Sequence, residues 1–141
     1  MIVDYKLNDK ISVVELTPSS KLFIVGLSHM KVNQVHVSFQ IPYGQANETI
    51  PESAHLLEHF VGTFSSNKYD DFKKNSIYFD SRSINTNAYT DLNKTLYYCS
   101  GRKEYLYSIL DIMLNSLYDF KFPNKIMKQE NDSVISELRM S

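Results

Sequence analysis

The chain has little of several residue types on which other protein classes depend. Its 141 residues contain one cysteine, Cys99, and no tryptophan. A single cysteine excludes an internal disulfide and a zinc cluster of several thiolates, and it is typical of a reducing compartment. No apolar run is long enough to span a membrane, and the charged N-terminus MIVDYKLNDK lacks the apolar stretch of a signal peptide. We therefore expect a cytoplasmic protein with no membrane contact, unless a leader was removed before this numbering begins.

A surplus of charge of one sign is also missing. The formal net charge is −1, which gives no electrostatic reason to expect nucleic acid or an anionic membrane as a partner. The hydrophobic share of 43% and the charged share of 22% are ordinary for a soluble globular protein. The length suits one domain with a real core. We therefore predict a single domain over residues 1–141.

The first forty residues have the pattern of strands. Residues 11–16 and 21–27 are β-branched runs separated by the turn-like TPSS, and residues 34–41 alternate apolar and polar side chains. These three segments predict a small antiparallel meander. Further along, residues 83–100 predict two strands joined around DLNK at residues 91–94.

Helical periodicity begins at Pro51 and returns twice. The first stripe consists of Ala54, Leu57, Phe60 and Val61. The second consists of Leu106, Ile109, Leu110, Met113, Leu114 and Leu117, which we expect to lie in the core. A last helix follows Pro123, with Asn124 as a candidate N-cap, and residues 67–75 form a charged surface helix or turn. The order of elements predicts an α+β fold, a mostly antiparallel sheet with helices packed on one face.

The stretch SAHLLEHFVGT carries the first chemical signal. His55 and His59 are one helical turn apart, so both imidazoles can reach one ion. Glu58 lies at the edge of the same face, where a base could take a proton from water activated by a metal. The order H-x-x-E-H is that of inverted zinc peptidases. A motif this short is equally compatible with two surface or helix-capping histidines.

The last helix offers further ligands. Glu130 and Glu137 are two helical turns apart and share a face with the apolar residues Met127 and Val134. Carboxylates within an apolar stripe are costly to bury unless a cation satisfies them, and zinc with histidines would do so. The alternative is a partly exposed stripe whose carboxylates pair with lysines.

Three stretches together resemble the pitrilysin, insulin-degrading enzyme and mitochondrial processing peptidase family of zinc metallopeptidases. AHLLEHFVGT is similar to that family's zinc helix, and NTNAYTDLNKTLYYCS is similar to its N-A-x-T strand with the strand that pairs with it. ENDSVISEL is similar to the helix that carries the distal glutamates. The resemblance covers nearly the whole chain in the right order. It implies that the chain is part of one pitrilysin-like half-domain.

The resemblance also implies a role for each matching position. His55, His59 and Glu137 would bind one Zn²⁺ per chain, and Glu58 would be the general base that activates water. Glu130 would take part in catalysis by orienting a histidine ligand. The strand Asn87, Ala88, Tyr89 and Thr90 would be a sheet edge to which a peptide substrate adds as an extra strand.

The chain departs from the family pattern at its end. A complete family half continues beyond the helix of Glu137, and a complete enzyme has a second half that helps to hold the peptide. We therefore expect a truncated domain, and a second family-like chain or self-association as partner.

The first hypothesis is a zinc metalloendopeptidase that hydrolyses extended peptides. The alternatives are a non-catalytic or partner-dependent peptide-binding subunit of a heteromeric processing peptidase, and a domain that zinc only stabilises. His36 and His29 are expected to be structural, and Cys99 to be a buried small apolar residue.

Overall fold

The computed structural model describes residues 11–17, 20–25, 33–121 and 127–140. The chain divides into two compact units, residues 1–32 and 33–141. In the first unit, β1 (Ile11–Thr17) and β2 (Ser20–Val25) form an antiparallel hairpin. Whether both units belong to one domain, as the sequence predicts, stays a prediction.

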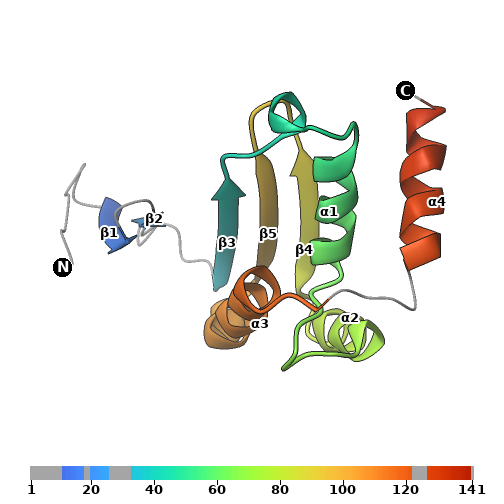
Figure 1. The fold of residues 1–141 in the computed structure, drawn as a ribbon. Coiled ribbons are helices and arrows are strands. Elements are labelled where there is room, and N and C mark those ends of the chain that lie inside the picture. The colour runs from blue at the N-terminus through green and yellow to red at the C-terminus, as the bar shows by residue number, and fades with distance from the viewer. Residues whose placement is uncertain (1–10, 18–19, 26–32, 122–126, 141) are drawn as a thin grey trace. The chain divides into compact units, whose positions relative to one another are not determined.

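The second unit contains one sheet and the helices around it (Figure 1). Its elements in chain order are β3 (Gln34–Ile41), the 3-10 turn η1 (Gln45–Asn47), α1 (Ser53–Gly62), α2 (Phe72–Asp80), β4 (Asn85–Thr90), β5 (Thr95–Arg102), the 3-10 turn η2 (Lys103–Tyr105), α3 (Leu106–Tyr118) and α4 (Met127–Leu138). Asn124, the candidate N-cap of the last helix, and His29 lie outside the described residues. None of the helices in the described ranges is both long and apolar enough to cross a membrane.

The sheet has the order β3-β5-β4, and both pairings are antiparallel. The predicted meander is correct for the β1-β2 hairpin, whereas β3 pairs with β5, which is far away in sequence. Residues that face each other across antiparallel strands share a side of the sheet, so Val37 and Cys99 point the same way as Tyr97 and Ala88. The helices pack on this side, which confirms the predicted α+β fold.

The core of the second unit lies between that face of the sheet and helices α1, α2 and α3. Its buried members are Val37, Val61, Phe64, Phe79, Ile84, Tyr97, Cys99, Ile109, Ile112 and Met113. Cys99 is fully buried, as predicted, and burial raises the pKa of its thiol to about 12. The thiol therefore stays protonated and unreactive at neutral pH.

One leucine in each predicted apolar stripe, Leu114 in α3 and Leu57 in α1, is exposed, and the other residues predicted for the core on α3 are buried in it or packed against it. In α3 the buried residues are Ile109, Ile112, Met113 and Ser116, while Leu114 is exposed. These four have the spacing i, i+3, i+4, i+7, so the buried face is turned away from Leu114. In α1 Leu57 is 45% exposed, because Glu58, four residues after the buried Ala54, occupies the place facing the sheet.

The start of α1 is fixed by a residue outside the helix. The carboxylate of Glu48 accepts hydrogen bonds from the backbone N–H of Glu52 at 2.8 Å and of Ala54 at 2.7 Å. Those amide groups would otherwise lack a partner at a helix N-terminus. Just upstream, Gly44 packs against the β4–β5 loop so closely that a Cβ would lie 2.1 Å from the carbonyl oxygen of Asp91. The chain that leads into α1 is thereby tied to the end of the sheet.

Candidate metal centre

Helix α1 places the two motif histidines on one face. His55 and His59 are one turn apart, and their ring centroids are 5.0 Å apart in an edge-on arrangement. Their side chains are 19% and 18% exposed, so both rings are largely withdrawn from water. From the edge of this face Glu58 reaches toward β4, and Ala54 is buried.

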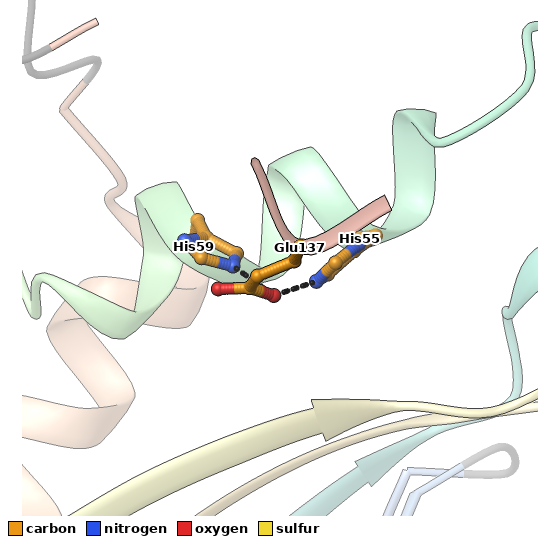
Figure 2. A group of neighbouring side chains, drawn as sticks. All are labelled: His55, His59 and Glu137. Atoms are coloured by element: carbon orange, nitrogen blue, oxygen red, sulfur yellow. Dashed lines mark ion pairs between the residues drawn. The ribbon is translucent and has the colours of Figure 1, made fainter. Parts of the chain in front are cut away.

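Helix α4 lies beside α1 and brings its carboxylates to these rings (Figure 1). Oε2 of Glu137 is 3.2 Å from Nε2 of His55 and 3.7 Å from Nε2 of His59. Figure 2 shows this carboxylate between the two imidazoles. Val134, which is 4% exposed, is the buried residue of α4 among the described ones. Its burial explains why the carboxylate face of α4 is turned toward α1.

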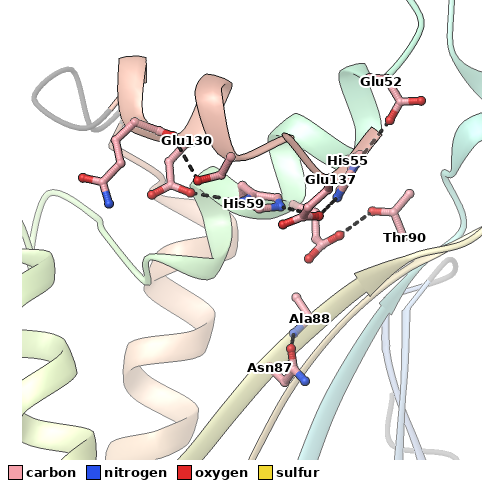
Figure 3. A network of polar contacts seen from close by, with 11 residues as sticks. Glu52, His55, His59, Asn87, Ala88, Thr90, Glu130 and Glu137 are labelled. Carbon is pink, nitrogen blue, oxygen red and sulfur yellow. Dashed lines mark hydrogen bonds and ion pairs between the residues drawn. The ribbon is translucent and has the colours of Figure 1, made fainter. Parts of the chain in front are cut away.

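The other ring nitrogens of the histidines also face carboxylates (Figure 3). Nδ1 of His59 is 3.1 Å from Oε2 of Glu130, and Nδ1 of His55 is 3.2 Å from Oε2 of Glu52. A carboxylate that accepts a hydrogen bond at Nδ1 holds the proton there and leaves the lone pair of Nε2 for a ligand. Both Nε2 atoms point at the same oxygen of Glu137.

The arrangement fits a divalent metal ion. One ligand atom each from His55, His59 and Glu137 can be chosen so that all lie within 4.8 Å of one another. A tetrahedral zinc site with bonds of 2.0–2.1 Å places its ligand atoms about 3.3 Å apart, close to the 3.2 Å between Glu137 and His55 and shorter than the 3.7 Å between Glu137 and His59. No lysine or arginine of the described residues forms an ion pair with any of the glutamates around the histidines. The negative charge at this place therefore calls for a cation.

Glu58 faces the sheet rather than α4. Its Oε2 accepts a 3.0 Å hydrogen bond from the hydroxyl of Thr90 at the end of β4. Burial raises the pKa of the neighbouring Tyr97, and the negative charge of Glu58 raises it further. The carboxylate of Glu58 is thus held between α1 and the sheet.

The four residues of the predicted substrate strand divide between two faces of β4. Ala88 and Thr90 are half-buried on the side of α1, whereas Asn87 and Tyr89 are exposed on the other side. In the described sheet β4 is an edge strand, as the substrate prediction requires. The side chain of Asn87 accepts a 2.8 Å hydrogen bond from the N–H of Ala88 (Figure 3). Binding of a peptide by these residues stays a prediction.

Comparison with known proteins identifies the family. Residues 24–141 match the insulinase family, peptidase family M16. A protein of Caenorhabditis elegans named "Putative zinc protease C28F5.4" is 29% identical over 119 residues, which are 83% of this chain and 14% of that protein. The chain therefore belongs to peptidase family M16, and it spans about a seventh of this relative.

Two solved structures have the same fold. The crystal structure of pitrilysin matches with a TM-score of 0.79 and 20% identity, over 99% of this chain and 15% of that one. A protease from Helicobacter pylori matches with a TM-score of 0.77 and 21% identity, over 93% of this chain and 31% of that one. Family membership implies zinc peptidase chemistry at the level of the family.

Sequence reasoning missed two residues that contact the site. Glu52 lies three residues before His55, which is the spacing of neighbours on one helix face, and this spacing is the signal that could have found it. Glu48 lies upstream of the helix, and no local sequence pattern marks it as the cap of α1. His36, in contrast, is exposed on the outer face of β3 and stacks against Tyr98, away from the other histidines.

Proposed function

We propose that this chain is the metal-binding part of a zinc-dependent endopeptidase of family M16. The observation that carries the proposal is the convergence of both Nε2 atoms on the carboxylate of Glu137, with no basic side chain paired to it in the described residues. Two histidines and one glutamate are a common protein ligand set of catalytic zinc, which leaves one coordination position for reactants. His55, His59 and Glu137 would hold the ion.

The residues around the ligands would have separate tasks. Bound zinc would supply Lewis-acid chemistry, by polarising a peptide carbonyl and acidifying water. Glu58 would accept the proton of the attacking water and later transfer it to the leaving amine. Glu130 would hold the ring of His59 through Nδ1, which keeps Nε2 free for the metal.

The peptide would bind at the edge of β4 that has no strand neighbour among the described residues. An extended peptide that pairs with Asn87–Thr90 would run along β4 and reach the end of the strand at Thr90, where Glu58 lies. Main-chain hydrogen bonds to such an edge tolerate many side chains, so unfolded or short peptides are the expected substrates. The contact between Asn87 and the N–H of Ala88 is local, and a peptide could replace it.

A partner-dependent role is the second candidate. The chain spans 14–31% of the relative and the two structures described above, so we propose that a complete substrate site would also use residues outside these 141. A second family-like chain, or self-association, would supply them. Peptide hydrolysis that appears only when such a partner is added would favour a subunit of a heteromeric processing peptidase. The cytoplasmic location likewise stays a proposal.

The decisive experiment measures zinc and hydrolysis in the same preparations. We expect about one zinc per chain by elemental analysis, as one His2Glu site requires. Glu58→Gln should keep this zinc and lower hydrolysis of a quenched peptide library by about 10²- to 10⁴-fold, the usual contribution of a general base. Protein that purifies without zinc and takes up none would contradict the proposal, and full activity in Glu58→Gln would remove Glu58 as the base.

A further inference from the structure

The backbone of Glu52, directly before α1, has a conformation that its residue type disfavours. Its φ is 65° and its ψ is 8°, in the left-handed region. Glycine enters this region without steric conflict, whereas a Cβ makes it unfavourable. A glutamate held there needs a reason in its surroundings.

The start of the helix does not provide that reason. Glu52 occupies the N-cap position, yet its own side chain makes no capping hydrogen bond. The cap is the carboxylate of Glu48, which accepts from the backbone N–H of Glu52 and Ala54. Glycine at position 52 would keep that N–H and would fit the backbone better.

The side chain of Glu52 points instead at a ligand of the proposed metal site. Its Oε2 is 3.2 Å from Nδ1 of His55, one helical turn later, and the two side chains are 30% and 19% exposed. Figure 3 shows this contact on the side of the ring opposite Glu137. Among the described residues, the ring of His55 is the side chain that contacts this carboxylate.

The two histidines are therefore held in the same way by different elements. His59 meets Glu130 of α4 at Nδ1 and Glu137 at Nε2, and His55 meets Glu52 at Nδ1 and Glu137 at Nε2. A neutral imidazole carries one N–H, and when Nε2 binds a metal ion that N–H lies on Nδ1, where Glu52 and Glu130 can accept it. Each ring then offers the lone pair of Nε2 to the same point.

We propose that Glu52 is a positioning residue that fixes the tautomer and the orientation of His55 for metal binding. The proposal rests on the proposed zinc site. The unfavourable backbone conformation of Glu52 is then tolerated because its side chain raises the affinity for zinc, and not because it stabilises the fold. Removal of the side chain should consequently weaken zinc binding and relieve the backbone at the same time.

The test compares Glu52→Gly with the wild-type chain. Zinc affinity is measured by competition with a chromophoric chelator, and the metal-free proteins are unfolded by heat and followed by circular dichroism. We expect affinity to fall about 10- to 100-fold, the usual effect of losing a hydrogen-bond partner of a ligand. We expect the unfolding midpoint of the metal-free variant to stay the same or to rise, because glycine fits the left-handed conformation.

Two further variants separate the causes. Ser83 also has a positive φ, 52°, in the exposed turn after α2. Ser83→Gly should raise the midpoint without any change in zinc affinity, and it is the matched control for strain relief. Glu52→Gln keeps an oxygen that can accept from Nδ1, so its loss of affinity should be smaller than that of Glu52→Gly.

The imidazole tautomers give a readout that does not depend on zinc. Because Glu137 also faces each Nε2, the rings are compared without metal in a Glu137→Ala background, where long-range ¹H–¹⁵N correlation should find both protons on Nδ1. In Glu52→Gly, His55 should lose this preference while His59, held by Glu130, keeps it. Unchanged affinity in Glu52→Gly, a lower midpoint of that variant without metal, or an unchanged His55 tautomer would each overturn the proposal. A wild-type chain that binds no zinc would overturn the proposed function, and the tautomer would then still decide the role of Glu52.

Discussion

The carboxylates of Asp111 on α3 and Glu137 on α4 lie in clusters that differ in the cations around them. Asp111 accepts from Nζ of Lys68 at 2.6 Å, from the hydroxyl of Tyr69, and from the side chain of Asn115. Hydrogen bonds from Lys68 and then Tyr69 lower the pKa of Asp111 below its ordinary value. The charge of this carboxylate is balanced within the protein.

The cluster around Glu137 has no such balance. Its partners are the rings of His55 and His59, which are themselves contacted by Glu52 and Glu130. Glu130 and His59 are each 18% exposed, whereas Glu137 itself is 50% exposed, which is similar to Lys68 and Asp111 at 55% and 43%. Carboxylates gathered in a half-buried place without a cation repel one another and lose hydration. The Asp111 cluster is therefore a surface ion pair whose charges already balance, whereas the Glu137 cluster needs a bound cation to balance its charge.

The largest expected effect is a difference in zinc-dependent stability between the two clusters. Zinc at 100 times its dissociation constant should stabilise the wild-type chain by about 2.7 kcal/mol, since it binds the folded state. Glu137→Gln should lose this stabilisation, and Asp111→Asn, the matched change in the other cluster, should keep it. Thermal unfolding with zinc and with chelator measures both. If zinc raised the unfolding midpoints of the two variants equally, the proposed difference between the clusters would be wrong.

A smaller effect is expected from Thr90, whose hydroxyl donates to Glu58. Hydrogen bonds to charged groups contribute about 1.5–3 kcal/mol, so Thr90→Val should lower peptide hydrolysis by about tenfold or more because Glu58 is less well held. Zinc affinity should remain within about twofold, since none of the proposed ligands is touched. Thr90→Ser, which keeps the hydroxyl, is the control. Hydrolysis by the valine variant at the wild-type rate would show that Thr90 does not position Glu58.

The smallest effect concerns acid stability in the Asp111 cluster. The folded pKa of Asp111 is lowered, so its contribution is full above the unfolded pKa of about 3.9 and is lost as pH falls through the folded value. Asp111→Asn should therefore lower the unfolding midpoint slightly at neutral pH and not at all near pH 2. The exposed Asp80→Asn is the control. A difference that persists at low pH would show that the contact does not depend on the charge of Asp111.

The predictable parts of the fold and of the candidate site are those with a local pattern. The helix of His55 and His59, the strands of residues 85–102 and the helix of α3 all follow from periodicity within about fifteen residues. The sequence predicts Leu114 in the core, but this residue is exposed, because a stripe of apolar residues does not say how far a helix is rotated against the sheet. The pairing of β3 with β5 was missed for a related reason, since strand neighbours in sequence need not be neighbours in a sheet.

The sequence by itself determined the order of chemical groups: two histidines one turn apart, a glutamate between them, and two further glutamates on a distant helix. Helical geometry is local, so these spacings define faces without any tertiary information. Only the tertiary structure decided that Glu130, 71 residues from His59, meets its Nδ1 and that Glu137 meets both Nε2 atoms. It also decided that Thr90 meets Glu58 and that Glu52 turns toward His55. Such contacts depend on how α4 packs on α1 and on the register of β4, which are set by the burial of side chains from the whole second unit.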